Sequence, residues 1–310
     1  MAEHTGLIGI TGATGAVGSR VARRLSAENH RLRLIVRDPA RLPELPGLPA
    51  APEAHPKAAP EADQETDQPL TADQRSAPEV HTATYGDAEA ARRALDGVDV
   101  LFMVSAAESP QRLQEHLTFI DAVADAQVNH VVYLSFTGAS PRATFTFART
   151  HHRTEEHLRA SGLRWTLLRD NFYFSLLEAM AGQDGVIRGP GGNGRVAAVS
   201  HTDVAASVAA VLRRAEDHRE QIYELAGPEA LTLSQIARTL TAATGRRLAY
   251  RRESVEEAYA SRSNYGVEQW QLDAWVSTYT AIAAGELERR SDITRLTGRP
   301  PMTFDQYLHA

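Results

Sequence analysis

Short apolar segments alternate with amphipathic ones along the first half of the chain. Continuous apolar runs of strand length predict buried strands, and they occupy residues 6–12, 32–37, 98–104, 130–134 and 163–168. Apolar residues at helical spacing predict helices between them, over residues 16–29, 87–95, 111–125 and 151–160. Strands that alternate with helices in this way predict βαβ units, and therefore a doubly wound parallel sheet of the α/β class.

The alternation loosens in the second half. Residues 185–200 carry a glycine-rich stretch between two apolar runs and predict a hairpin. Residues 232–244 predict a helix that ends at Gly245, and the remainder is mainly helical. We therefore predict a domain over residues 1–170 and a smaller α+β lobe over residues 171–310, some segments of which return to the sheet.

Residues 43–79 break the pattern. They hold eight of the fifteen prolines and eight acidic residues, with almost no large apolar side chains. Such a segment cannot bury enough apolar surface to offset the entropy of ordering it, so we predict an insertion that forms a mobile loop or linker. It also contains Lys57, the only lysine of the chain, so chemistry that needs a lysine must recruit this residue.

The composition excludes several classes of site. A formal net charge of −6 argues against a nucleic-acid partner, which usually requires a basic surface. The absence of cysteine excludes disulfides, thiolate nucleophiles and cysteine metal ligands. No apolar run approaches the roughly 18 residues of a membrane-spanning helix, and the first residues lack the features of a secretory signal. We expect a cytoplasmic monomer or homodimer without a membrane partner.

The sequence TGATGAVG at residues 11–18 joins the first predicted strand to the first predicted helix. Glycine at its three spaced positions permits a tight turn and lets backbone N–H groups approach a pyrophosphate at the helix N-terminus. In this context the motif predicts a Rossmann dinucleotide site, with no metal and no flavin. The residues expected to contact the cofactor here are Gly12, Thr14, Gly15, Ala16, Val17 and Gly18.

The end of the second strand distinguishes the two nicotinamide cofactors. An acidic residue there would bind the ribose 2′-hydroxyl of NAD, whereas an arginine suits the 2′-phosphate of NADP. Arg37 occupies this position and Arg41 lies one turn further on, which favours NADP(H). Asp38 follows directly, so NAD(H) stays open as the alternative.

Several longer segments carry a family resemblance. The segments GITGATGAVG, LIVRDPARL, YGD, TEEHLRASGLRWTLLRDNFY and STYTAIAAGELERRSDITRLTGRPP together resemble the NmrA-like family, an atypical branch of the short-chain dehydrogenase/reductases. The similarity is greatest to its NAD(P)H:quinone oxidoreductase members and spans the chain except residues 43–79. The resemblance implies a Rossmann domain, a small C-terminal substrate lobe and a nicotinamide cofactor. We also expect Asp87 of YGD and Ser105, which follows the fourth predicted strand, among the cofactor contacts.

The superfamily's usual Tyr-x-x-x-Lys pair is replaced here. The resemblance puts Phe147 at the tyrosine position and His151 at the lysine position. Phenylalanine has no proton to give, which argues against alcohol dehydrogenation and sugar-nucleotide epimerisation. We expect His151 to bind a ribose hydroxyl or to donate a proton, the alternative being an exposed histidine at a helix start. His152 and His157 lie on other faces of that helix and are expected to be solvated.

Further candidates follow the predicted strands, where ligands of doubly wound sheets bind. Ser135 matches the catalytic serine of the superfamily, which polarises a substrate carbonyl; the alternative is a hydroxyl that satisfies the strand end. The residues expected to contact a flat aromatic substrate are Thr137, Phe147, Asn171, Phe172 and Tyr173. The alternative for the aromatic ones is a role in the core between domain and lobe.

The combined interpretation is an NAD(P)H-dependent reductase of quinones. A quinone suits a site without the tyrosine acid, because its reduction product is aromatic and stabilised. An extension is a polycyclic substrate of aromatic polyketide biosynthesis whose hydroquinone reacts with O₂, which would resemble a monooxygenase. The alternative from another class is a dinucleotide-sensing regulatory protein without turnover.

Overall fold

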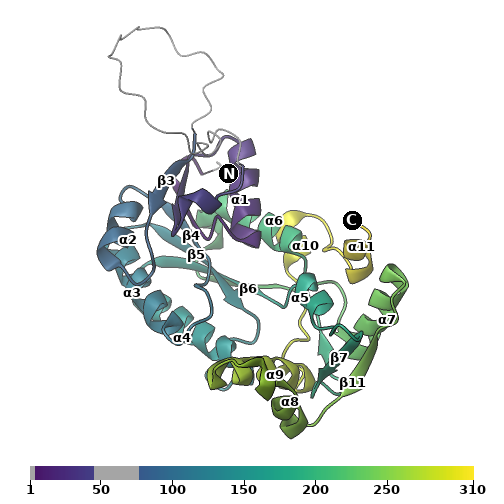
Figure 1. Cartoon of the computed structure of the whole chain (residues 1–310). Coiled ribbons are helices and arrows are strands. Elements are labelled where there is room, and N and C mark those ends of the chain that lie inside the picture. The colour runs from purple at the N-terminus through teal and green to yellow at the C-terminus, as the bar shows by residue number, and fades with distance from the viewer. Residues whose placement is uncertain (1–3, 45–76) are drawn as a thin grey trace, which may run out of the picture.

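The computed structural model describes residues 4–44 and 77–310, and a seven-stranded parallel sheet forms its centre (Figure 1). The strand order is β3-β2-β1-β4-β5-β6-β9, so the order reverses at β1, as in a doubly wound sheet. This confirms the predicted fold class. The strands are β1 (Ile8–Thr11), β2 (Leu32–Val36), β3 (Glu79–Thr82), β4 (Val100–Met103), β5 (His130–Phe136), β6 (Arg164–Asp170) and β9 (Gln221–Leu225).

Helices cover both faces of this sheet. Val17, Val21 and Leu25 of the first helix pack with Ile8 and Ile10 of β1, as their helical spacing requires. The helices of this face are α1 (Ala16–Ala27), α6 (His201–Leu212) and the short α10 (Ile293–Thr297). The helices of the opposite face are α2 (Ala88–Leu95), α3 (Arg112–Asp125) and α4 (Thr146–Ala160).

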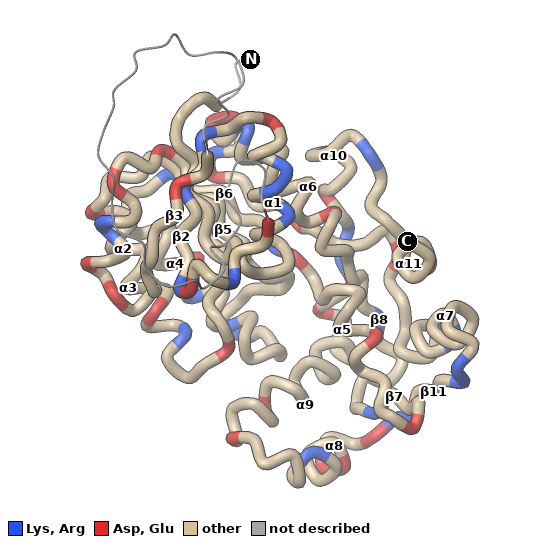
Figure 2. The backbone as a smooth tube through the Cα atoms, turned by 45° about the horizontal axis from the view of Figure 1, so that its top comes forward, with Lys and Arg blue, Asp and Glu red and all other residues tan. Residues whose placement is uncertain are grey.

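A second group of elements lies to one side of the sheet (Figure 1; Figure 2). Its core joins Phe136, the last residue of β5, and Phe172, just after β6, to Ile187, Leu233 and Tyr279. The lobe therefore packs against the carboxyl ends of the central strands. Its elements are α5 (Phe174–Ala179), β7 (Val186–Gly189), β8 (Arg195–Val196), β10 (Leu231–Thr232), α7 (Leu233–Thr244), β11 (Ala249–Arg252), α8 (Val255–Arg262), α9 (Gln269–Ala283) and α11 (Phe304–Leu308).

The hairpin predicted over residues 185–200 is wrong. Its two strands do not pair with each other, because β7 pairs in parallel with β11 and β8 pairs antiparallel with β10. Between them the chain passes directly over α9: a side chain on Gly194 would place its Cβ 1.9 Å from the carbonyl oxygen of Ile282. A local apolar pattern predicts a strand but cannot identify a partner that lies 35 or more positions away.

Two other elements differ from the prediction. The edge strand β3 was missed because its residues are mostly exposed and form no apolar run. Helix α4 begins at Thr146, so Phe147 and His151 lie one turn apart on one helix. The predicted insertion over residues 43–79 falls mainly on residues 45–76, which lie outside the described residues together with Lys57. The predicted helix end at Gly245 is confirmed, and this residue takes the left-handed φ of 68° that favours glycine.

Candidate active site

A glycine turn connects β1 to α1. Gly12 has a φ of +64°, and Gly15 precedes the helix without any side chain that caps its first turn. A Cβ on Gly18 would lie 2.2 Å from the carbonyl oxygen of Gly12, so only glycine fits there. The backbone N–H groups at the start of α1 are thus open to a bound anion, as a dinucleotide pyrophosphate requires.

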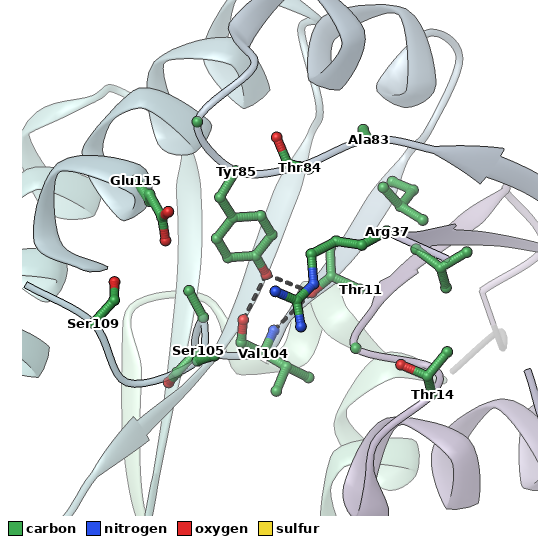
Figure 3. A pocket seen from close by; sticks show the side chains of 16 residues that line it. Thr11, Thr14, Arg37, Ala83, Thr84, Tyr85, Val104, Ser105, Ser109 and Glu115 are labelled. Carbon is green, nitrogen blue, oxygen red and sulfur yellow. Dashed lines mark hydrogen bonds between the residues drawn. The ribbon is translucent and has the colours of Figure 1, made fainter. Parts of the chain in front are cut away.

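A groove of about 370 Å³ runs from this turn across the carboxyl ends of β1, β2 and β4 (Figure 3). Arg37 follows β2, and Figure 3 shows its side chain extending across the groove towards Tyr85 and Thr11. Within residues 4–44 and 77–310 its guanidinium has no ion-pair partner. The carboxylate of Asp38 is used differently, because it accepts a hydrogen bond from the backbone N–H of Ala40 at 3.1 Å. This geometry favours a phosphate ligand for Arg37.

Tyr85 forms the floor of the groove and was not predicted. Its hydroxyl donates to the carbonyl oxygen of Val104 at 2.5 Å and lies 2.7 Å from the Thr11 hydroxyl, while its ring stacks on Phe119. Burial raises the pKa of this hydroxyl, so it stays protonated. Asp87, two residues on, is exposed and caps α2 by accepting from the N–H of Ala90 at 2.9 Å, and it is not among the groove-lining residues.

A second cavity of about 310 Å³ adjoins the groove. Residues 104–107, which follow β4 and include the predicted Ser105, line both spaces, so the two form one continuous site. Ends of β5 and β6 and the start of α4 supply the other walls. Its aromatic side chains are Phe136, Phe145, Phe147, Phe172 and Tyr173, three of which were predicted.

Two side chains of α3 form hydrogen bonds to the backbone of Ala106, in the segment of residues 104–107 that lines both spaces. The backbone N–H of Ala106 donates to Nε2 of His116 at 2.8 Å, and its carbonyl oxygen accepts from Nε of Arg112 at 3.1 Å. Burial, and then the charge of Arg112, lower the pKa of His116 to about 3, so its imidazole is neutral and can accept. The wall between groove and cavity is therefore preorganised by the fold.

His151 lies in this cavity, but the structure does not support a role as a proton donor. Its Nε2 lies 3.0 Å from Nη2 of Arg112, which can only donate, and its Nδ1 lies 2.9 Å from the Tyr133 hydroxyl. Burial, then Arg112, hold its pKa well below 6.5. Both ring nitrogens of a neutral imidazole thus already have protein partners, which revises the sequence hypothesis towards a positioning role.

Arg112 is the first residue of α3 and was not predicted. Its side chain is 5% exposed, and its Cζ lies 5.1 Å from the centre of the Phe147 ring. Across the described parts of the chain no carboxylate forms an ion pair with it, and burial lowers its pKa. The cavity therefore contains a buried cation without a direct counter-ion.

Asp170, at the end of β6, is the second polar group that was missed. Its carboxyl lines the cavity, is 7% exposed and accepts a hydrogen bond from the Tyr173 hydroxyl. Burial raises its pKa to about 7, against the opposing effects of Tyr173 and Arg112. A carboxyl with this pKa exchanges its proton near neutral pH. Its position at a strand end, directly before the predicted Asn171, was the available sequence signal.

Two predicted hydroxyls point away from both cavities. Ser135 is fully buried and donates to Glu155 at 2.6 Å, and Thr137 donates to Glu224 at 2.6 Å. Neither lines the groove or the adjoining cavity, so the expected substrate contacts do not form in this geometry. Asn171 does line the cavity, but its amide is engaged by the carbonyl oxygen of Leu287 and the N–H of Phe172.

Within 4–44 and 77–310, no group of three or more histidine, aspartate or glutamate side chains is placed to hold a metal ion. Across the same ranges, no helix combines the length and apolar character needed to cross a bilayer.

Comparison with known proteins identifies relatives along nearly the whole chain. Quinone oxidoreductase 2 of Escherichia coli (strain K12) is 33% identical over 229 residues, which cover 73% of this chain and 79% of that protein. NAD(P)H azoreductase of Xenophilus azovorans is 28% identical over 311 residues, which cover 98% of this chain and 97% of that protein. The Escherichia coli NADPH-dependent quinone oxidoreductase complexed with NADPH is a structural relative, with a TM-score of 0.80, 29% identity, and coverage of 97% of this chain and 98% of that one.

The family model for the NmrA-like family matches residues 4–308. This match and the relatives above agree with the glycine turn, the doubly wound sheet and the lobe at its carboxyl edge. The chain belongs to the NmrA-like family.

Proposed function

We propose that this protein is an NADPH-dependent reductase that transfers a hydride to a planar quinone-type acceptor. The main support for the proposal is that residues 104–107 line both the dinucleotide groove and the adjoining aromatic cavity. A cofactor in the groove would therefore border an acceptor in the cavity. The relatives named for quinone and azo reduction support this class of acceptor.

The groove fits a phosphorylated dinucleotide. Glycines at positions 12, 15 and 18 leave room for a pyrophosphate at the N-terminus of α1. Where a 2′-phosphate is expected, Arg37 presents a guanidinium that forms no ion pair with any other described residue. The nicotinamide, when bound, supplies the hydride. The structural relative that contains NADPH supports NADP(H) over NAD(H).

The cavity fits a flat apolar ring. The ring of Phe145 packs edge to face against two others, with ring centres 5.3 Å apart for Phe172 and 5.6 Å apart for Phe147. The three rings form one aromatic lining on the side of the lobe. These side chains exclude water from the reacting face. Phe147, in place of the superfamily's tyrosine, adds apolar surface and removes the usual acid.

Asp170 supplies the acid in this proposal. A quinone that accepts a hydride becomes a hydroquinone monoanion and needs one proton. Oδ2 of Asp170 accepts from Tyr173, which leaves Oδ1 to hold the proton and pass it to the acceptor oxygen. The carboxyl is then an anion until solvent restores its proton, and its pKa of about 7 allows both steps.

The test is loss of NADPH absorbance after addition of 2-methyl-1,4-naphthoquinone, with oxygen recorded in the same vessel. Quinone-dependent oxidation of NADPH supports the reductase. NADPH binding without oxidation by any quinone supports the dinucleotide-sensing alternative. Oxygen consumption together with a hydroxylated product from a polycyclic substrate supports the extension to aromatic polyketide hydroxylation.

A further inference from the structure

Burial of the charged guanidinium of Arg112 costs free energy of desolvation. A charge that is removed from water is destabilising unless a counter-ion or a full set of hydrogen bonds compensates it. Arg112 is 5% exposed, and no carboxylate in the described ranges forms an ion pair with it. After Tyr133, the acidic groups that act on its charge are Glu108 and Asp170, and burial raises the pKa of both carboxyls.

The fold does not require a cation at this position. Arg112 begins α3, where the helix dipole is positive and disfavours positive charge. Its two hydrogen bonds, from Nε to Ala106 and from Nη2 to His151, could be made by a neutral donor. A guanidinium has five N–H groups, and among the described residues only these two bonds engage them, so the remaining donors can bind a ligand in the cavity that Arg112 lines.

The neighbours of Arg112 fix the direction of these free donors. Phe147 lies under the guanidinium with its centre 5.1 Å from Cζ, and His151 occupies Nη2. The planar guanidinium thus contacts the flat ring of Phe147 and the neutral imidazole of His151. An aromatic ligand with an ionised oxygen on its edge would match this arrangement, because guanidinium binds oxyanions by paired hydrogen bonds.

We propose that Arg112 is the anion subsite of the acceptor cavity and selects aromatic acceptors that bear an ionised oxygen, a phenolate or a carboxylate. This inference rests on the proposed reductase function and defines its substrate class as acidic quinones. The same guanidinium also favours the oxyanion that develops during reduction, but the selection between acceptors comes from the ionised substituent.

The kinetic test compares two naphthoquinones of similar size. 2-Hydroxy-1,4-naphthoquinone is an anion at neutral pH, and 2-methyl-1,4-naphthoquinone is neutral. In Arg112→Met we expect kcat/KM to fall about tenfold more for the anionic quinone than for the neutral one, since a charge-assisted hydrogen bond is lost. Arg112→Lys should restore part of this preference. A proportional fall for both quinones would overturn the proposal, because a merely structural arginine affects both alike.

The matched control is Arg149→Met. Arg149 is an exposed arginine of the adjacent helix, also bonded to a backbone carbonyl oxygen, and it lines neither cavity. The same change of residue type there should leave the ratio between the two quinones unaltered. If the control shifts the ratio as much as Arg112→Met, the preference is a long-range charge effect and the subsite is refuted.

A binding experiment on the unmodified protein needs neither turnover nor a folded variant. Calorimetry with NADPH present should show that 2-naphthoate binds about tenfold more tightly than 2-naphthamide, its neutral counterpart. Equal affinities would overturn the proposal for carboxylates, and an unaltered kcat/KM ratio between the two quinones in Arg112→Met would overturn it for phenolates. Selective naphthoate binding in a protein that reduces no quinone would refute the reductase function and leave the anion subsite standing.

Discussion

Replacement of Asp170 by asparagine tests the proton source directly. Asparagine has nearly the same shape and can still accept the hydrogen bond from Tyr173, but it cannot release a proton. We expect kcat for quinone reduction to fall by about 100-fold, the lower range for loss of a general acid. In the unmodified protein kcat should decrease as the pH rises through about 7, because the protonated carboxyl is the active form.

The same substitution has a calculable effect on stability. The pKa of Asp170 rises from 3.8 to about 7 on folding, so the folded chain holds this proton more tightly than the unfolded chain. Its contribution to the free energy of unfolding is therefore present at low pH and is lost as the pH rises between these values. At about 1.36 kcal/mol per pH unit the total is about 4 kcal/mol, of which more than half is lost between pH 5 and pH 8.

Two assays measure these effects. Urea unfolding of both proteins at pH 5 and pH 8 should show the asparagine variant gaining stability relative to the unmodified protein at the higher pH. Initial rates across the same pH range should lose the decline near pH 7 in the variant. The other charged or titratable groups that influence Asp170 are Tyr173, Arg112 and Glu224, and all three are unchanged in the variant. An asparagine variant with an unaltered rate profile and a pH-independent stability difference would refute the proton-donor role.

Three further substitutions test the groove and the core. Arg37→Asp should weaken NADPH binding about tenfold and shift preference towards NADH, and a retained NADPH preference in steady-state kinetics would place the phosphate elsewhere. Gly18→Ala should abolish NADPH binding and lower stability by about 1–3 kcal/mol, because its Cβ would meet the Gly12 carbonyl oxygen at 2.2 Å; calorimetry and thermal unfolding that match the unmodified protein would contradict this. Glu155→Gln removes the buried negative charge that pairs with Arg169 at 2.7 Å and with Arg159 at 3.0 Å, and should lower the free energy of unfolding by about 3 kcal/mol; a urea-unfolding difference near zero would show that this charge does not stabilise the fold.

The groove could be predicted from the sequence because its parts are local. The strand, the glycine turn and the helix lie within residues 8–27, and each has a pattern that is visible over a few positions. Arg37 lies directly after the next strand, so the rule for ligand positions at strand ends applies without knowledge of the packing. The dinucleotide site could therefore be predicted from the order of strand, glycine turn and helix along the chain, without knowledge of tertiary contacts.

The acceptor cavity could be predicted only in part. From the sequence alone, Arg112 would be interpreted as a solvated arginine at the start of a helix. Its burial depends on contact with α4, about 40 positions further along the chain. Ser135 was expected to face the substrate, but every residue of β5 is buried, so alternation along the strand could not show which face carries the cavity. Asp170 acquires its raised pKa from its burial in the folded chain, which no spacing in the sequence reveals.

The most direct test of the central claim is anaerobic single turnover with one equivalent of NADPH and excess 2-methyl-1,4-naphthoquinone. We expect loss of NADPH absorbance with one hydroquinone formed per NADPH. The loss should be slower when the transferred hydrogen of NADPH is replaced by deuterium. NADPH that remains bound and unoxidised in the presence of the quinone would contradict hydride transfer to the quinone.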